Sequence, residues 1–108
     1  MADNHIYKIA FLNKDQVYEV YAKHVYQGEL YGFIVVEGLV FGEASTLLVD
    51  PAEEKLKTEF EGVKRSFIPM HEIIRIDQVE RRGTAKILPL AKESGTGGKL
   101  SGLYTPNR

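Results

Sequence analysis

The residues best placed to carry chemistry lie in the segment SFIPMHEIIRIDQVERRG, residues 66–83. His71 followed by Glu72 resembles the start of a zinc-protease helix, but the second histidine of that motif is missing. No histidine of the chain lies three to five residues from another histidine, and there is no cysteine. Because zinc ligands typically have such spacing, we predict no metal site and no cofactor. We interpret His71 as a structural residue that caps or closes a helical turn after Pro69.

Nucleophiles and phosphate-binding loops are equally poorly represented. None of the four serines stands in the Gly-x-Ser-x-Gly elbow that exposes a catalytic hydroxyl group. Residues 95–99 resemble a phosphate-binding loop, but they lack the full motif, and no helix is expected after them. Glu53 and Glu54 are predicted to lie in a solvated turn. The sequence therefore predicts no catalytic residue and no enzyme.

Two basic doublets, Lys64-Arg65 and Arg81-Arg82, are the candidates for contact with nucleic acid. The first opens one predicted strand and the second closes the next, so the doublets could form one small positive patch. RNA-binding barrels often combine such a patch with aromatic side chains, because phosphate contacts supply affinity and stacking adds to it.

Aromatic side chains for such stacking are available in the tyrosines, five of which lie within the first 31 residues. Tyr18 and Tyr21 are an odd number of positions apart, so on a regular strand they face opposite sides. We therefore expect one of the two to be exposed. High strand propensity alone also explains the tyrosines, and we favour that interpretation.

Charge is distributed unevenly along the chain. Residues 1–80 carry 8 Lys and Arg against 14 Asp and Glu, a net charge of −6, whereas residues 81–108 carry 6 against 1, a net charge of +5. The acidic body weighs against phosphate binding, because carboxylates repel phosphate. Residues 91–108 are predicted to form a flexible basic tail, since their Gly, Ser and Thr content cannot bury a core.

Length and composition indicate one globular domain, residues 1–90, followed by that tail. The chain has 108 residues, of which 44% are hydrophobic and 27% charged, values typical of globular domains. Its start does not resemble a signal peptide, and its densest apolar window, residues 30–41, is too short for a membrane helix. We expect a soluble cytoplasmic protein that does not insert into a membrane.

Most of the domain reads as short strands separated by turns. Residues 6–12 and 16–25 are rich in aromatic and β-branched residues, and residues 13–15 carry turn chemistry. Residues 26–29 are predicted to form a hairpin turn in which Gly28 adopts a positive φ. Residues 30–36 then read as a central strand buried on both faces, and Phe33 is expected in the core.

Two segments leave alternatives open. Residues 55–60 alternate like a strand, but a helix that starts at Asp50, with Pro51 as its first residue, is the competing interpretation. Residues 69–82 read either as one helical turn at 69–73 followed by a strand, which we prefer, or as a single helix. In the preferred interpretation Ile76 is a core residue. A last short strand is expected at 84–88.

The order of these elements resembles the small SH3-like and Sm-like barrels, in which one helical turn links the last two strands. The segment LLVDPAEEKLKTEFEGVKRSFIPMHEIIRIDQVE, residues 47–80, is more specifically similar to a bacterial family of small proteins, domain-of-unknown-function family 1820. That resemblance covers about residues 6–90 and implies no activity, ligand or site residue. We therefore expect a mainly β fold, either a strongly bent antiparallel sheet or an SH3-like barrel.

The function expected of such a domain is binding rather than catalysis. A barrel this small has no room for a deep ligand cavity, so its edges, faces and loops are the usable surfaces. An unknown protein or peptide is the favoured partner, and RNA or another nucleic acid, bound through Lys64, Arg65, Arg81 and Arg82, is the alternative. The sequence does not predict an oligomeric state.

Overall fold

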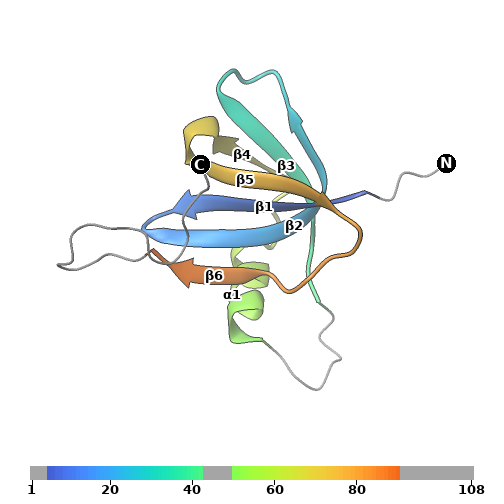
Figure 1. Cartoon of the computed structure of the whole chain (residues 1–108), viewed down its shortest axis with the longest axis vertical. Helices are drawn as coiled ribbons and strands as arrows, with labels where there is room; N and C mark the ends of the chain where they lie inside the picture. The colour runs from blue at the N-terminus through green and yellow to red at the C-terminus, as the bar shows by residue number, and fades with distance from the viewer. Residues whose placement is uncertain (1–4, 43–49, 91–108) are drawn as a thin grey trace.

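The computed structural model describes residues 5–42 and 50–90, which form an antiparallel sheet with one helix packed beside it (Figure 1). In chain order the strands are β1 (Ile6–Asn13), β2 (Gln16–Gln27), β3 (Phe33–Val40), β4 (Arg65–Pro69), β5 (Ile73–Val79) and β6 (Lys86–Pro89). The helix α1 (Pro51–Glu59) lies between β3 and β4 in the chain, and the 3-10 helix η1 (Met70–Glu72) joins β4 to β5. The predicted mainly β fold, with one helical turn after Pro69, is confirmed.

The first two strands form a tight hairpin. Lys14 and Asp15 occupy the turn with φ values of 51° and 65°, and Asn13 pairs with Gln16 on either side of them. Positive φ at both central residues is the geometry of a type I′ turn, whose twist matches that of the flanking strands. The turn sets the register that places Ile9 opposite Val20 in the core.

The long strand β2 makes the sheet bend. One edge of β2 pairs with β1, while its other edge pairs with β6 near residue 17 and with β3 from residue 21 onward. Gly38 in β3 lies at this bend with a φ of 70°. A Cβ atom there would lie 3.1 Å from Cβ of Lys23, so both the backbone conformation and the close approach favour glycine.

The helix α1 occupies residues for which a strand was preferred, so that prediction is wrong and the helical alternative is right. Asp50 caps the helix, with Oδ1 accepting hydrogen bonds from the backbone N–H groups of Ala52 at 2.9 Å and Glu53 at 3.2 Å. Pro51 suits the first helical position. One fully buried side chain, Leu56, joins the core, so the capped start outweighs the strand-like alternation that follows it.

The connection between β2 and β3 differs from the predicted hairpin turn. Gly32, not Gly28, adopts the positive φ, at 84°. Strand β3 therefore begins at Phe33, and Leu30 and Tyr31 lie in the loop with exposed side chains. The predicted continuous strand over residues 30–36 is wrong in its first half, because the glycine conformation breaks the extended chain there.

The passage from β4 to β5 follows the preferred interpretation. Pro69 ends β4, η1 turns the chain, and β5 continues to Val79, so the single-helix alternative for residues 69–82 is wrong. The sheet order is β4-β3-β2-β1-β5, and no pairing within residues 5–42 and 50–90 joins β4 to β5. The bent sheet is therefore open, with β4 and β5 at its two ends.

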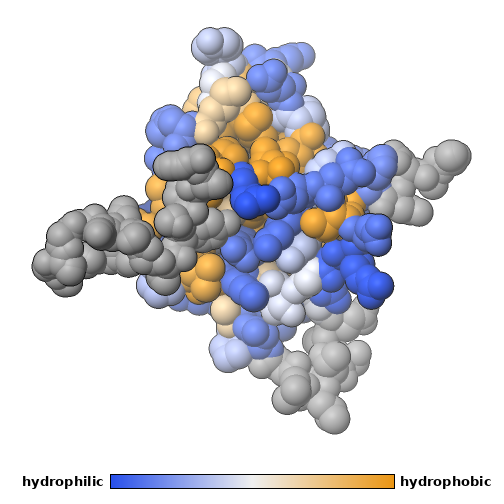
Figure 2. Space-filling model, in the orientation of Figure 1, coloured by the Kyte–Doolittle hydropathy of each residue, from blue (hydrophilic) through white to orange (hydrophobic). Residues whose placement is uncertain are grey.

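This opening changes the burial predicted for two side chains. Ile76 pairs with the fully buried Ile9 but is 37% exposed, because no strand in the described part of the chain pairs with the outer side of β5. Phe33 is only partly buried. Both were expected in the core, and both expectations are wrong. In Figure 2, apolar side chains gather over the part of the visible surface where β3, β4 and β5 lie in Figure 1.

The core lies between the bent sheet and α1. Its buried members are Ile9, Phe11, Tyr18, Val20, Ala22, Val36, Leu56, Ile68 and Ala85. No helix within the described ranges has the length and apolarity needed to cross a membrane. The predicted tail at 91–108 lies outside the described residues.

Candidate functional site

A hollow of about 620 Å³ lies where β2, β3, β4 and the loop before β3 meet. It is lined by Tyr26, Gly28, Glu29, Leu30, Val35, Arg65 and Phe67. Its size falls within the range of about 300–1,000 Å³ that is usual for ligand sites. The candidate site therefore combines three strands and one loop, at the end of the sheet that β4 forms.

The centre of the hollow is a row of three side chains on adjacent strands. Tyr26 pairs with Val35, and Val35 pairs with Phe67, so all three point to the same face of the sheet. Val35 is only 2% exposed, whereas Phe67 is 44% exposed. The hollow thus has a covered aliphatic floor, and Phe67, Tyr26 and Leu30 form walls that water still reaches.

One end of the hollow is closed by a polar cluster around Glu37. Oε2 of Glu37 accepts a hydrogen bond from Nε of Arg65 at 2.7 Å and another from the hydroxyl group of Tyr26 at 3.0 Å. The hydrogen bond from Arg65, and after it the bond from Tyr26, lower the pKa of the Glu37 carboxyl group. Desolvation, followed by the bond to Glu37, raises the pKa of Tyr26. At neutral pH the cluster therefore holds a carboxylate, a guanidinium and a neutral phenol.

The two basic doublets lie at different strands, Lys64-Arg65 at the start of β4 and Arg81-Arg82 just after β5. Arg65 bonds to Glu37, and Lys64 beside it is exposed. Arg81 is exposed, whereas Nη1 of Arg82 donates to the carbonyl oxygen of Gly83 at 3.2 Å. Nucleic-acid binding through these four residues stays a prediction.

The tyrosines are arranged differently from the expectation. Tyr18 and Tyr21 are both buried, so the prediction that one of them is exposed is wrong. Tyr18 stacks at a tilt on Phe11, with ring centroids 5.5 Å apart, and donates to Glu59 at 2.9 Å. Among the tyrosines in the described ranges, the exposed ones are Tyr26, in the hollow, and Tyr31, which is 96% exposed in the adjoining loop.

His71 lies in the predicted helical turn but has no capping role there. The side chain is 80% exposed, and its Nε2 lies 3.4 Å from Oε2 of Glu72. No side chain caps η1, so the capping part of the prediction is wrong. The described part of the chain contains no group of three His, Asp or Glu side chains that could hold a metal ion.

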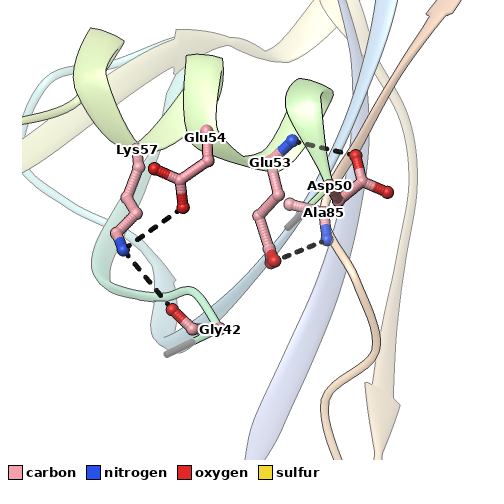
Figure 3. A network of polar contacts seen from close by, with 6 residues as sticks. All are labelled: Gly42, Asp50, Glu53, Glu54, Lys57 and Ala85. Carbon is pink, nitrogen blue, oxygen red and sulfur yellow. Dashed lines mark hydrogen bonds and ion pairs between the residues drawn. The ribbon is translucent and has the colours of Figure 1, made fainter. Parts of the chain in front are cut away.

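A second polar cluster ties α1 to the segment before β6, as Figure 3 shows. Oε2 of Glu53 accepts a hydrogen bond from the buried N–H group of Ala85 at 3.1 Å. Oε2 of Glu54 lies 3.6 Å from Nζ of Lys57, and the same Nζ donates to the carbonyl oxygen of Gly42 at 3.5 Å. Glu53 is buried, so the expected solvated turn is wrong for that residue. This cluster joins elements of the fold.

The sequence did not reveal the hollow. Its walls come from Tyr26, Leu30 and Phe67, which are far apart in the chain and meet only through strand pairing. The one signal available was the alternation of Arg65 and Phe67 with Ser66 and Ile68, which places the first two on one face.

The model of a family described as a domain of unknown function, DUF1820, matches residues 5–97. The chain belongs to the DUF1820 family. The match spans every strand and helix described above, so the hollow lies wholly within the DUF1820 domain. No curated protein and no solved structure matches the chain.

Proposed function

We propose that this DUF1820 domain is a non-enzymatic binding module that recognises an extended segment of a partner protein in the hollow beside β4. The observation that carries the proposal is the row of Tyr26, Val35 and Phe67, a half-exposed apolar surface next to the end strand of an open sheet. Domains of this kind bind peptides by main-chain pairing at a strand edge and by pockets for alternate side chains.

The composition of the hollow supports a protein partner. Aromatic side chains and arginine are enriched at protein interfaces, and a few residues, Trp, Tyr and Arg above all, carry most of the binding energy once they are buried by the partner. Phe67, Tyr26 and Leu30 supply that apolar area, and the carboxylate of Glu37 orients both Tyr26 and Arg65. A rigid polar end beside an apolar floor discriminates between side chains that differ in polarity.

The alternative, nucleic-acid binding, draws on the exposed side chains of Lys64, Arg81 and Tyr31. The carboxylate of Glu37 weighs against it, because it partly neutralises Arg65. We also propose the cytoplasm as the location, which fractionation of host cells tests.

Affinity capture from host lysate tests the proposal with three forms of the chain. The wild type is compared with Phe67→Ser, which removes one wall of the hollow. Tyr31→Ser is the matched control, because Tyr31 is more exposed than Phe67 but does not line the hollow. Half of each sample is treated with nuclease.

We expect specific proteins to be captured by the wild type and by Tyr31→Ser, to be lost with Phe67→Ser, and to survive nuclease. Capture that Phe67→Ser leaves intact contradicts the hollow as the site. Capture of RNA or DNA that nuclease abolishes supports the alternative instead.

A further inference from the structure

The outer edge of β4, which faces away from β3, exposes the backbone groups of alternate residues. The backbone N–H group of Met70 donates to the carbonyl oxygen of Gly32 at 2.8 Å, so the backbone of residue 70 faces β3. Because backbone groups alternate along a strand, Ile68 and Ser66 also face β3. The N–H and C=O groups of Phe67 and Arg65 then point away from the sheet, where no described strand pairs with them.

Pro69 fits this alternation. Its position places its missing N–H group on the free edge, where no hydrogen bond of the β3–β4 ladder is lost. The free edge therefore offers two N–H groups and two carbonyl groups, from Arg65 and Phe67, because the carbonyl group of Pro69 at the start of η1 belongs to the 3-10 turn. A strand that pairs with this edge gains main-chain hydrogen bonds centred on Phe67.

Side chains of such an added strand would meet two of the residues that line the hollow. Residues directly opposite each other in a sheet point to the same face. A residue opposite Phe67 thus extends the row of Tyr26, Val35 and Phe67. A residue opposite Arg65 lies beside the guanidinium group.

Arg65 has donors left for a ligand. Glu37 engages only its Nε, and no other described residue bonds to its two Nη groups. A guanidinium group binds a carboxylate strongly when two N–H groups share the contact. Glu29 also lines the hollow, so a carboxylate is disfavoured beside Glu29 and favoured beside the Nη groups of Arg65, although the pair with Glu37 weakens that attraction.

We infer that the partner segment adds to β4 as an antiparallel strand, with an apolar residue opposite Phe67 and an Asp or Glu two residues later, opposite Arg65. The inference rests on the proposed function and names the partner's chemistry. Antiparallel pairing lets Phe67 exchange both of its backbone hydrogen bonds with a single residue, and it is the more stable arrangement per residue. In an antiparallel pair the partner segment runs from Phe67 toward Arg65, so the acid follows the apolar residue in the partner's sequence.

Selection of short random peptides on the full purified chain, by display, tests the inference. We expect the peptides that bind in a Phe67-dependent way to share an apolar residue followed two positions later by Asp or Glu. Replacing that acid by its amide should weaken binding about two- to fivefold, the range of an exposed cross-strand charge pair. The same replacement should have no effect on the Arg65→Gln variant.

N-methylation of the selected peptide tests strand pairing itself. Methylating the amide of the apolar residue removes the donor to the carbonyl group of Phe67, and should weaken binding roughly fivefold or more. Methylating the next amide, which points away from β4 in an antiparallel pair, should change binding little. A parallel strand would show the reverse order.

Different results overturn the added strand and the hollow as a binding site. Phe67-dependent peptides that lack the spaced acid, or that tolerate both methyl groups, overturn the added strand and leave the hollow as a binding site. A selection that yields no Phe67-dependent peptide overturns the proposed function, and the inference with it.

Discussion

Arg65 and Glu37 lie directly opposite each other on β4 and β3, with Nε of Arg65 2.7 Å from Oε2 of Glu37. The pair closes one end of the hollow and fixes the face to which the guanidinium group is presented. Tyr26 donates to the same carboxylate oxygen from β2. One carboxylate thus links three neighbouring strands, and its protonation should weaken that link.

The first prediction concerns the pH dependence of this link. Because the folded protein lowers the pKa of Glu37 below its ordinary value of 4.5, the group stabilises the fold above that value. The contribution is lost as pH falls through the lowered pKa. The free energy of unfolding of the wild type should exceed that of Glu37→Gln more at about pH 7 than at about pH 3.

Denaturant melts at the two pH values measure this difference. In an Arg65→Gln background the pH dependence of the difference should shrink, because the main cause of the lowered pKa is then removed. An undiminished pH dependence in that background would assign the effect to another partner.

The second prediction separates two adjacent glutamates in α1. Glu53→Ala leaves the buried N–H group of Ala85 without its acceptor, and should lower the free energy of unfolding by about 1–3 kcal/mol. Glu54→Ala removes only a half-exposed contact with Lys57, and should change it by less than about 0.5 kcal/mol. Equal losses in urea melts would show that the bond to Ala85 is not the cause.

The third prediction compares two isoleucines that face each other across β1 and β5. Ile9→Ala removes a fully buried side chain and should cost about 2–5 kcal/mol of unfolding free energy. Ile76→Ala removes one at the open end of the sheet, and should cost less than about 2 kcal/mol. A loss for Ile76→Ala as large as that for Ile9→Ala would mean that β5 is covered in solution.

The fourth prediction concerns His71. Its side chain is 80% exposed, and its one polar contact among the described residues is with Glu72, so His71→Asn should change the free energy of unfolding by less than about 1 kcal/mol. Capture of partners should also be unchanged. Loss of a partner by a normally folded His71→Asn variant would make the turn after Pro69 a functional site.

The sequence predicts those elements whose cause is local. The turn predicted over residues 13–15, the end of β4 at Pro69 and the helical turn after it all follow from neighbouring residue types. Where two local signals compete, the alternation over residues 55–60 is misleading. The cap at Asp50 is a stronger determinant there than strand propensity.

The site could not be predicted, because it depends on pairing between distant segments. Phe67 looks like an ordinary strand residue until its register with Val35 and Tyr26 is known. Likewise, nothing near Ile76 in the sequence indicates that its strand pairs on one side only with the other described strands. Family membership is visible in the sequence, but it brings no activity with it.

The hairpin of β1 and β2 has a consequence for how the chain folds during synthesis. Among the described residues it carries five of the nine buried members of the core cluster and is closed by a two-residue turn, so its own contacts are local and form fast. A lone hairpin is only marginally stable. Its next partner β3 follows directly in the chain, but β5 and β6 are made much later by the ribosome. The outer edge of β1, which pairs with β5, therefore stays unpaired through most of translation, when a chaperone would protect it best.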